Sequence, residues 1–538
     1  AFGAPDDEQY RHLRLAGGKL AWQPLAGGPS APVAAPSPVR LSDRRGAPLW
    51  NDGAPTEAAS AAGLAPLLGF GPEHASSVAG MLARLPTAGA PVTATLTLDL
   101  PLQALSQRIL ECVGMRQGRW TGAGCADGPV AQRISQARRA GLVILDTETG
   151  DVLAAASGGG GEVNAANWTE ARDHDRTNPA RSALRLPALQ HDGGAHQSPG
   201  STFKVISALG LEMAAQKMAA QKDRQLDALL AGLPLPTINA LARQRGFGFQ
   251  TGSPTYPQAP RQARITNYRE QGLDRRAQDG RLGLAQALTY SLNTWFAWTG
   301  ELSDRSLFGR PDGGAPGVQA LDADALDAVR PIVAAAHRLG FEQPVRLDGG
   351  LLPSDFDWRT WDALQATPAH IDTIHTRHEL RQMAIGLRMQ VTPLHMALAS
   401  AAVGQGRLVV PRLLLDLDGR QSKIPAMAPT GVRLDRIRAG MKGVVDAGTG
   451  AGAFGGPALA AVRPGLYGKT GTAPTGDDTA TVWFTGWLEP GTLPGQAHRL
   501  AIAAFVSHSD STGGGHAAPV VAAVLATLAG QNAEQKGK

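Results

Sequence analysis

The chain has few cysteines and no long hydrophobic run. Only two of its 538 residues are cysteines, Cys112 and Cys125, and the Gly-rich stretch between them would let the chain fold back so that they meet. A disulfide of an oxidising compartment and two unrelated reduced thiols fit this pair equally well. No segment reaches the about 18 to 20 continuous apolar residues of a membrane-spanning helix, the best candidate being Ala517–Gly530. Because the sequence begins with Ala-Phe-Gly rather than Met, we expect the full-length protein to carry a membrane anchor that this sequence lacks.

The chain also lacks a strong excess of one charge. Its 51 basic and 46 acidic side chains are interleaved and give a formal net charge of +5. This pattern excludes nucleic acid as an expected partner, and a mildly basic surface is ordinary for soluble proteins. With 43% hydrophobic residues the chain is long enough for one large and one smaller domain.

Composition divides the chain near residue 91. Residues 1–91 are rich in Ala, Pro and Gly, with one short helical pattern at His74–Leu85, and indicate a small loop-rich N-terminal module. Alternation at Val92–Leu98 predicts a strand, and Leu102–Val113 follows with helical spacing. We therefore expect a larger domain at 92–538.

Strands are predicted at both ends of this larger domain. Leu142–Leu145 and Val152–Ala156 form a hairpin around a turn at 146–151, and Thr479–Trp487 and Leu500–Ser507 form a second pair, before a helix at Ala518–Leu528. The pattern predicts one mixed sheet assembled from distant strands, with helices around it. Residues 221–279 are polar and weakly periodic, so we expect an insertion outside the core. Long helices are predicted between the strands at Thr202–Gln221, Leu282–Glu301, Ala325–Arg338 and Leu380–Val403.

Three short motifs carry residues suited to catalysis. In Ser198–Lys204, small residues precede a helix, and one turn brings Ser201 and Lys204 onto the same face. The positive end of the helix and partial burial both disfavour a charged ammonium, so Lys204 is a candidate base for Ser201. The alternative is that Ser201 is only a helix N-cap.

The second motif, Ser291-Leu-Asn293, interrupts an apolar helical run with short polar side chains. The Ser291 hydroxyl is suited to relaying a proton, and Asn293 offers a donor and an acceptor for a peptide amide. The alternative is a polar break between two packed helices.

The third motif is Gly468-Lys-Thr-Gly-Thr472, just before a predicted strand and hence at or near a sheet edge. Lys469, Thr470 and Thr472 together suit a carboxylate, and Gly471 lets a ligand approach the backbone. The backbone N–H of Thr472 is a candidate oxyanion donor. A phosphate loop is excluded because its frame requires Gly at position 463, which is Arg.

Together the three motifs resemble those of the penicillin-binding protein transpeptidase domain. The resemblance extends over about 92–530 and implies an α+β fold with a mostly antiparallel central sheet flanked by helices. Flanking stretches at Leu142–Ala154, Val391–Ala397 and Gly513–Pro519 are similar to family segments as well. The motifs read Ser198-Pro-Gly-Ser-Thr-Phe-Lys204, Ser291-Leu-Asn-Thr-Trp-Phe296 and Gly468-Lys-Thr-Gly-Thr-Ala473.

The resemblance implies a peptidoglycan D,D-transpeptidase that works without cofactor or metal on the extracytoplasmic face of the bacterial inner membrane. Stem peptides ending in D-Ala-D-Ala would be the substrates, β-lactams the inhibitors, and cell-wall synthesis proteins of the elongation or division machinery the partners. The implied catalytic residues are Ser201, Lys204 and Ser291, and the implied substrate-binding residues are Asn293, Lys469, Thr470, Gly471 and Thr472.

The chain departs from the family pattern in two places. These departures affect the expected shape of the cleft rim and the choice of acceptor substrate. The spacing from Ser201 to Ser291 is longer than usual, and Gly386–Val391 replaces a Gly-Gln-Gly type of sequence. The N-terminal module is too short for a glycosyltransferase, which favours a class B-like enzyme. A D,D-carboxypeptidase and a non-catalytic β-lactam-binding sensor or scaffold remain alternatives, whereas a β-lactamase is disfavoured because no Glu-x-x-Leu-Asn sequence is present.

A cluster of His370, Asp372, His375 and His378 is the one candidate for a metal site. It lacks the His-Glu-x-x-His frame, so we expect no metal there.

Overall fold

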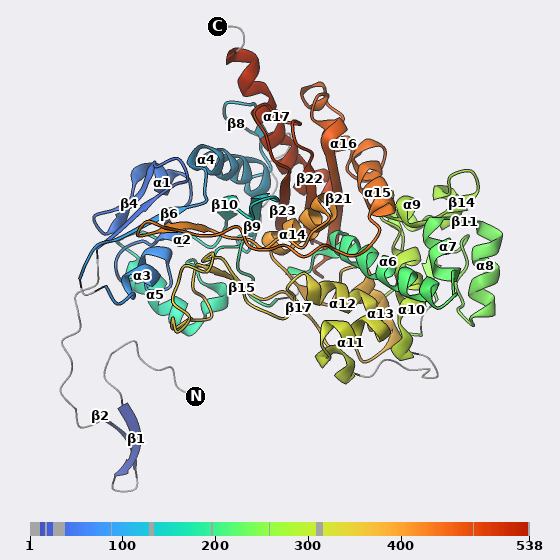
Figure 1. The fold of residues 1–538 in the computed structure, drawn as a ribbon, viewed down its shortest axis with the longest axis horizontal. Helices are drawn as coiled ribbons and strands as arrows, with labels where there is room; N and C mark the ends of the chain where they lie inside the picture. Colours follow the sequence, from blue (N-terminus) through green and yellow to red (C-terminus); the bar gives the residue numbers. More distant parts are fainter. Residues whose placement is uncertain are drawn as a thin grey trace.

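The computed structural model describes residues 11–16, 19–24, 38–87, 89–128, 134–194, 197–257, 259–307, 316–476 and 478–535. Its central layer is a five-stranded sheet in the order β10-β9-β23-β22-β21, in which every neighbouring pair is antiparallel (Figure 1). The strands come from two distant parts of the sequence, and the fold is α+β, as expected. Their bounds are Ala140–Asp146 (β9), Val152–Gly158 (β10), Leu466–Pro474 (β21), Ala480–Leu488 (β22) and Leu500–Ser509 (β23).

Both faces of this sheet are covered by helices. Alternate residues of a strand point to opposite faces, so Leu142 and Ile144 lie in one hydrophobic cluster and Val143 and Leu145 in the other. One face packs against α14 (Pro393–Gln405), and the other against α4 (Leu100–Ile109) and α17 (Ala518–Gln535). Burial on both faces explains why β9 reads as a continuous apolar run.

The predicted hairpin, the second strand pair and the C-terminal helix are confirmed as β9–β10, β22–β23 and α17. The region Gly513–Gly530, which overlaps the first part of α17, is the one part of the described chain long and apolar enough to cross a membrane. Half of it is buried within the protein, and a single such region is weak evidence for a span.

The predicted single helix at 282–301 is wrong. The structure has two helices, α9 (Leu284–Thr289) and α10 (Asn293–Ser303). Between them Ser291 has a φ of 56°, in the left-handed region that a right-handed helix does not contain. This break presents the second motif as a loop between two helix ends.

Two further predicted helices are also divided. The expected helix at 325–338 is divided into α11 (Ala323–Val329) and α12 (Pro331–Arg338). The division falls at Pro331 because proline has no backbone N–H to donate a hydrogen bond to the preceding turn. The expected 380–403 helix is split into α13 (Arg377–Ala384) and α14. Here Gly386, at a φ of 89°, turns the chain after α13.

The N-terminal part forms a second sheet with strand order β20-β19-β6-β3-β4-β5. Strand β3 of the expected module pairs in parallel with β6, so residues on both sides of position 91 share one sheet. The division into 1–91 and 92–538 stays a prediction. The strands are Val39–Ser42 (β3), Pro48–Asn51 (β4), Ala54–Pro55 (β5), Val92–Leu96 (β6), Leu414–Leu417 (β19) and Arg420–Gln421 (β20), and the helices beside them are Glu57–Ala61 (α1), Ala65–Leu68 (α2) and Val78–Ala83 (α3).

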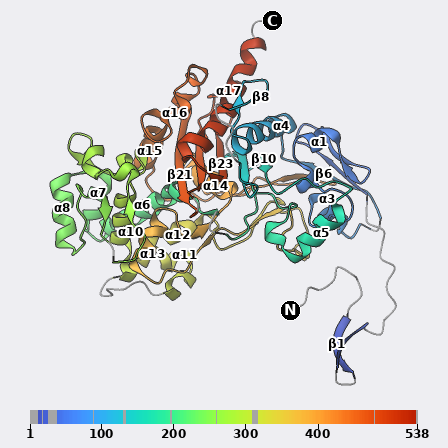
Figure 2. The same ribbon diagram turned by 180° about the vertical axis from the view of Figure 1, so that it is seen from behind.

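Residues 221–279 contribute to the hydrophobic core, contrary to expectation. Leu229, Ile238 and Tyr256 are buried in the main cluster, and the ring of Phe249 stacks on that of Trp298 with centroids 4.5 Å apart. The segment forms α7 (Gln225–Ala231) and α8 (Leu235–Gln244), on the far side of the central sheet from the N-terminal strands (Figures 1 and 2). Its apolar residues are spaced too irregularly to predict this burial.

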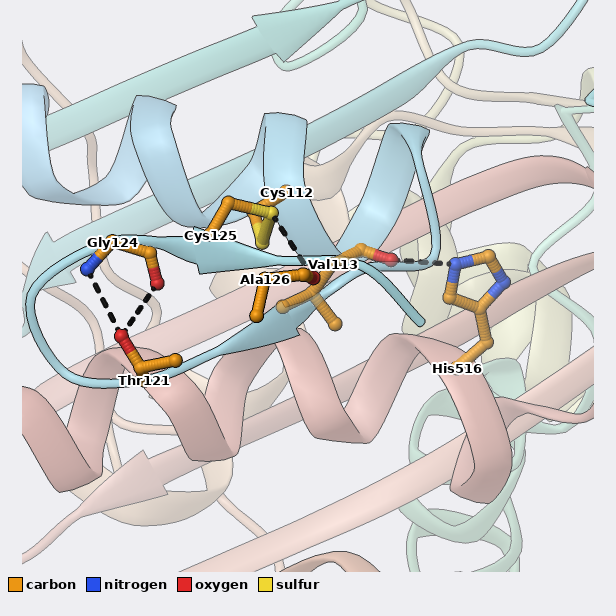
Figure 3. Close-up of a disulfide and its surroundings, with 7 residues drawn as sticks. All are labelled: Cys112, Val113, Thr121, Gly124, Cys125, Ala126 and His516. Atoms are coloured by element: carbon orange, nitrogen blue, oxygen red, sulfur yellow. Dashed lines mark hydrogen bonds between the residues drawn. A yellow bond between two sulfur atoms is a disulfide. The ribbon is translucent and has the colours of Figure 1, made fainter. Parts of the chain in front are cut away.

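The two cysteines form a disulfide. Cys112 lies on the π-helix η1 (Leu110–Met115) that continues α4, and Cys125 lies on β8 (Cys125–Ala126), which pairs with β7 (Arg119–Trp120) (Figure 3). His516 contacts the carbonyl oxygens of Val113 and Gly114, at 3.0 Å from each, and so joins η1 to the chain after β23.

Short pairs of strands and three helices, together with α6 (Lys204–Ala220), complete the set of described strands and α-helices. The strands are Arg11–Ala16 (β1) with Lys19–Pro24 (β2), Leu233–Pro234 (β11) with Arg281–Leu282 (β14), Thr255–Tyr256 (β12) with Ile265–Thr266 (β13), Val345–Arg346 (β15) with Gln365–Ala366 (β16) and His370–Ile371 (β17) with Met389–Gln390 (β18); the helices are Trp168–Thr177 (α5), Asp435–Asp446 (α15) and Ala451–Phe454 (α16).

Candidate active site

The first and third motifs meet at the edge of the central sheet. Ser201 lies on the short 3-10 turn η4 (Gly200–Phe203), which leads into α6 (Lys204–Ala220), and η4 packs against the edge strand β21. Gly200 has a φ of 52°, and a Cβ there would fall 2.7 Å from the carbonyl oxygen of Thr472. A Cβ on Gly471 would fall 2.4 Å from the carbonyl oxygen of Pro199. Glycine at both positions therefore lets the two backbones come into direct contact.

The amine of Lys204 lies at the centre of the site. Its Nζ is 2.9 Å from the Oγ of Ser201 and 3.2 Å from the Oγ of Ser291. It also lies 2.9 Å from the Ser291 carbonyl oxygen and 2.6 Å from the Oδ1 of Asn293. The Ser291 carbonyl oxygen and the Asn293 Oδ1 can only accept hydrogen bonds, so a neutral Lys204 amine donates its two N–H groups to them. The remaining lone pair of the amine is then available to the Ser201 hydroxyl.

Burial favours the neutral form of this amine. Lys204 is fully buried, and both desolvation and the nearby charge of Lys469 hold its pKa well below the usual value. Lys469 is also fully buried, and desolvation lowers its pKa to about 7. Its Nζ donates to the carbonyl oxygen of Thr470 at 3.0 Å. Two lysines of lowered pKa in one pocket are a feature of functional sites rather than of ordinary cores.

The amide of Asn293 has a defined orientation. Its Nδ2 donates to the carbonyl oxygen of Thr266 at 2.8 Å, which leaves Oδ1 facing Lys204. The neighbouring Asn267 strengthens this link, because its Nδ2 donates to the Thr294 hydroxyl at 3.0 Å and its Oδ1 accepts from the Thr294 backbone N–H at 3.1 Å. One N–H of the Asn293 amide remains for a ligand.

The hydroxyl groups of the third motif are also held in place. The Oγ1 of Thr470 lies 2.6 Å from that of Thr449, and the Oγ1 of Thr472 accepts from the backbone N–H of Gly513 at 3.1 Å. Gly513 also needs to lack a side chain, because a Cβ there would fall 2.4 Å from the carbonyl oxygen of Gly471. The chain after β23 thus supports the edge strand that carries the motif.

The three motifs border a single cleft of about 390 Å³. Six of the sequence-predicted residues line this cleft: Ser201, Ser291, Asn293, Thr470, Gly471 and Thr472. Lys204 and Lys469 are buried beside the cleft and are joined to it through their hydrogen bonds. A larger cavity of about 520 Å³ near His498 contains no motif residue. Sequence reasoning did not identify seven residues that also line the cleft: Thr266, Asn267, Tyr268, Tyr290, Thr449, Thr512 and Gly514.

The four residues considered as a metal site do not form one group of ligands. The Nδ1 of His370 lies 2.7 Å from Glu342, and its Nε2 is 3.8 Å from Asp372. Within the described ranges, no three or more His, Cys, Asp or Glu side chains are grouped so that they could hold a metal ion.

Comparison with solved structures identifies similar folds. The D,D-transpeptidase domain of a peptidoglycan glycosyltransferase from Eggerthella lenta has 20% identity and a TM-score of 0.56, covering 94% of this chain and 100% of that one. PBP2 from Pseudomonas aeruginosa, in complex with WCK 5153, has 19% identity and a TM-score of 0.56, covering 91% and 95%. The penicillin G acyl-enzyme complex of penicillin-binding protein A from M. tuberculosis has 20% identity and a TM-score of 0.55, covering 92% and 99%. At these identities the likeness shows the fold alone.

Sequence comparison adds the family. No curated protein matches the chain. The model of the penicillin binding protein transpeptidase domain matches residues 247–526, more than half of the chain. The match contains the second and third motifs and begins after Ser201 and Lys204, which the fold brings to the same cleft. The chain therefore belongs to the penicillin-binding protein transpeptidase domain family.

Proposed function

We propose that this protein is a peptidoglycan D,D-transpeptidase that acylates Ser201 with stem peptides ending in D-Ala-D-Ala and transfers them to an amine. The observation that carries the proposal is the 2.9 Å contact between the Lys204 amine and the Ser201 hydroxyl, with acceptor-only oxygens on the other side of the amine. Such a pair supplies a nucleophile and its base without a third residue.

In the proposed acylation, neutral Lys204 takes the proton of the Ser201 hydroxyl as Oγ attacks the carbonyl carbon between the two D-alanines. The oxyanion accepts hydrogen bonds from the backbone N–H groups of Ser201 and Thr472, whose chain segments are in contact. Ser201 lies in the first turn of a helix, where backbone N–H groups have no partner within the helix. The proton then passes by way of Ser291 to the nitrogen of the leaving D-alanine, whose C–N bond breaks.

The remaining residues hold the donor peptide. Asn293 binds a peptide amide through its free N–H, and Lys469 with the hydroxyls of Thr470 and Thr472 binds the terminal carboxylate. After D-alanine leaves, an amine of a neighbouring stem peptide attacks the ester and restores Ser201. β-Lactams occupy the same positions as the donor, consistent with the penicillin G acyl-enzyme formed by the similar M. tuberculosis protein.

Members of this family act on peptidoglycan outside the cytoplasm. We propose the extracytoplasmic face of the bacterial inner membrane as the site of action. Peptidoglycan stem peptides are the proposed substrates and cell-wall synthesis proteins the proposed partners. The chemistry uses neither cofactor nor metal.

Two alternative functions use the same residues. A D,D-carboxypeptidase differs only in transferring the acyl group to water, and a β-lactam-binding sensor acylates without turning over peptide. The ordered contacts around Lys204 serve acylation, which a sensor shares, so turnover of a peptide substrate distinguishes an enzyme from a sensor.

Intact-mass spectrometry after mixing the protein with a penicillin tests the nucleophile. We expect a stable adduct that is lost in Ser201→Ala and retained in Ser198→Ala, a matched control whose hydroxyl only donates to the Met389 carbonyl oxygen at 2.8 Å. An adduct that persists in Ser201→Ala contradicts the assignment, rapid loss of the adduct indicates a β-lactamase, and absence of any adduct indicates a scaffold. Release of D-alanine from a donor peptide, with and without an acceptor amine, separates transpeptidase from carboxypeptidase.

A further inference from the structure

The buried ring of His516 joins two segments that lie far apart in the sequence. Its Nε2 lies 3.0 Å from the carbonyl oxygens of Val113 (Figure 3) and Gly114, and its Nδ1 lies 2.8 Å from the Oγ of Ser509. Burial lowers the pKa of His516, and the charge of Arg138 lowers it further, so the ring is neutral. Carbonyl oxygens only accept hydrogen bonds, so Nε2 carries the proton and Nδ1 accepts from the Ser509 hydroxyl. Both ring nitrogens are thus paired, and the ring is held in one orientation.

On one side of this link is the disulfide. Val113 and Gly114 belong to η1, which also carries Cys112, and the bond to Cys125 ties η1 to the hairpin of β7 and β8. Cys112 is buried, whereas Cys125 is exposed, so a dissolved thiol can reach the bond. Because η1 is a π-helix, it has a rare conformation that occurs most often as a single turn near a functional site. The disulfide fixes the segment whose carbonyl groups receive His516.

On the other side of the link is the strand that carries the third motif. His516 lies on η11 (Gly513–Ala517), which is the second π-helix of the described chain. At the start of η11 the backbone N–H of Gly513 donates to the Oγ1 of Thr472, and a Cβ on Gly513 would fall 2.4 Å from the carbonyl oxygen of Gly471. The next residue, Gly514, lines the cleft. The short helix that His516 anchors is therefore in direct contact with Thr472, the proposed oxyanion donor.

A second side chain keeps η1 attached to the central sheet. Arg138 donates to the carbonyl oxygen of Met115, at the end of η1, at 3.1 Å and to that of His508, on β23, at 2.9 Å. This contact does not involve η11. A change at His516 should therefore release η11 from η1 while η1 stays in its place on the sheet.

We propose that His516 is a positioning residue that transmits the geometry fixed by the disulfide to Thr472, so that acylation is fastest while the disulfide is intact. This inference rests on the proposed function and adds a dependence on redox state to it. A dithiol breaks the S–S bond, adds one hydrogen to each sulfur and is itself oxidised to a disulfide. The segment η1 then loses its covalent link to the hairpin, so the carbonyl groups that hold His516 are fixed less firmly. A less firmly held oxyanion donor stabilises the transition state less.

Penicillin acylation of the wild-type protein in two redox states tests the inference. The protein is treated with a dithiol, the dithiol is removed, and acylation is followed at several penicillin concentrations. This separates the dissociation constant of the first complex from the rate constant of acylation. We expect reduction to lower the rate constant about threefold and to leave the dissociation constant within about twofold, because a small displacement of a donor affects the transition state most. Reoxidation should restore the rate.

Variants at His516 separate positioning from a general loss of stability. His516→Leu should be acylated about tenfold more slowly, and His516→Gln should recover most of the rate, because its amide N–H can donate near the position of Nε2. The rate of His516→Leu should not respond to the dithiol, since η11 is already released from η1. His74→Leu is the matched control: His74 is also 3% exposed, but its ring packs on Phe70 and Trp168. It should keep both the wild-type rate and the response to the dithiol.

Three outcomes would count against these assignments. Equal acylation rate constants for oxidised and reduced wild-type protein overturn the inference, and this comparison needs no variant that has to fold. A response to the dithiol in His516→Leu as large as that of wild type also overturns it, because the disulfide would then act by another route. Absence of any penicillin adduct in the oxidised wild-type protein contradicts the proposed function instead.

Discussion

The Nζ of Lys204 lies 2.6 Å from the Oδ1 of Asn293, so the base of the first motif donates to the amide of the second. This contact gives Asn293 two tasks. Its Nδ2 is available to a substrate, and its Oδ1 directs the Lys204 lone pair toward Ser201. The charge at this one atom should therefore control the protonation of the base.

Asn293→Asp tests this control. A carboxylate of nearly the same shape beside Nζ stabilises the ammonium and raises the pKa of Lys204. We expect the acid side of the pH profile of penicillin acylation to move to higher pH, so that acylation slows at the acid end of the profile. Asn239→Asp is the control, because Asn239 is bonded to Thr251 away from the cleft. An unchanged acid limb contradicts the role given to Oδ1.

The pH dependence of kcat/KM for D-alanine release should be bell-shaped. Acylation rises with pH while Lys204, whose pKa is held well below its usual value, loses its proton and becomes a base. It falls above about pH 7 as Lys469, whose pKa is about 7, loses the charge proposed to bind the terminal carboxylate. The same peptide with a terminal carboxamide should react slowly and lack the alkaline limb. An alkaline limb shared by both peptides would assign that limb to another group.

Gly386→Ala should destabilise the protein and displace the nucleophile. A Cβ at Gly386 would fall 1.8 Å from the carbonyl oxygen of Gly200, and its φ of 89° is unfavourable for alanine. We expect the free energy of unfolding in urea to drop by roughly 2 to 4 kcal/mol, with slower acylation. Gly246→Ala has a similar φ of 71° and open space around it, so it should cost about 1 kcal/mol and leave acylation unchanged. Equal effects of the two changes would show that the contact with Gly200 is unimportant.

Removing the disulfide should lower the free energy of unfolding. The bond between Cys112 and Cys125 spans 13 positions, and a loop of that size predicts about 3 kcal/mol of stabilisation by restricting the unfolded chain. Urea unfolding of a Cys112→Ser/Cys125→Ser variant measures the loss. A reducing agent should destabilise the wild-type protein to the same extent and leave the variant unaffected; a response in the variant would point to a different cause.

Local spacing predicted which of these residues lie close together better than it predicted how the chain turns between them. Ser201 and Lys204 meet because one helical turn separates them. Lys469 lies on the edge strand β21, which pairs with the predicted strand that follows it. The breaks at Ser291 and Gly386 both depend on a left-handed backbone conformation. At Ser291 the contacts of the folded chain impose this conformation. At Gly386 the glycine permits it, but a glycine within a helical pattern does not by itself predict a break. Helical periodicity alone therefore joined elements that the structure separates.

The residues that complete the cleft have no sequence signature. Tyr268 and Thr449 come from segments without a motif, Tyr290 lies just before the second motif, and the pairing of Asn267 with Thr294 depends on tertiary contact. The sequence alone could not decide whether Cys112 and Cys125 form a disulfide, because the distance between two cysteines in sequence does not fix their distance in space.

The order of strands in the central sheet bears on how the enzyme becomes active during synthesis. Strand β9 is made early, yet its only partner besides β10 in that sheet is β23, in which Ala504 pairs with Leu142. The strand that carries Lys469 joins the sheet through β22 and then β23. Pairing β9 with β23 closes a very long loop, which is slow and becomes favourable only once the late strands are present. A nascent chain thus contains Ser201, the proposed nucleophile, long before it has a cleft. If Ser201 reacts with β-lactams as proposed, these antibiotics should act on completed molecules rather than on chains still being made.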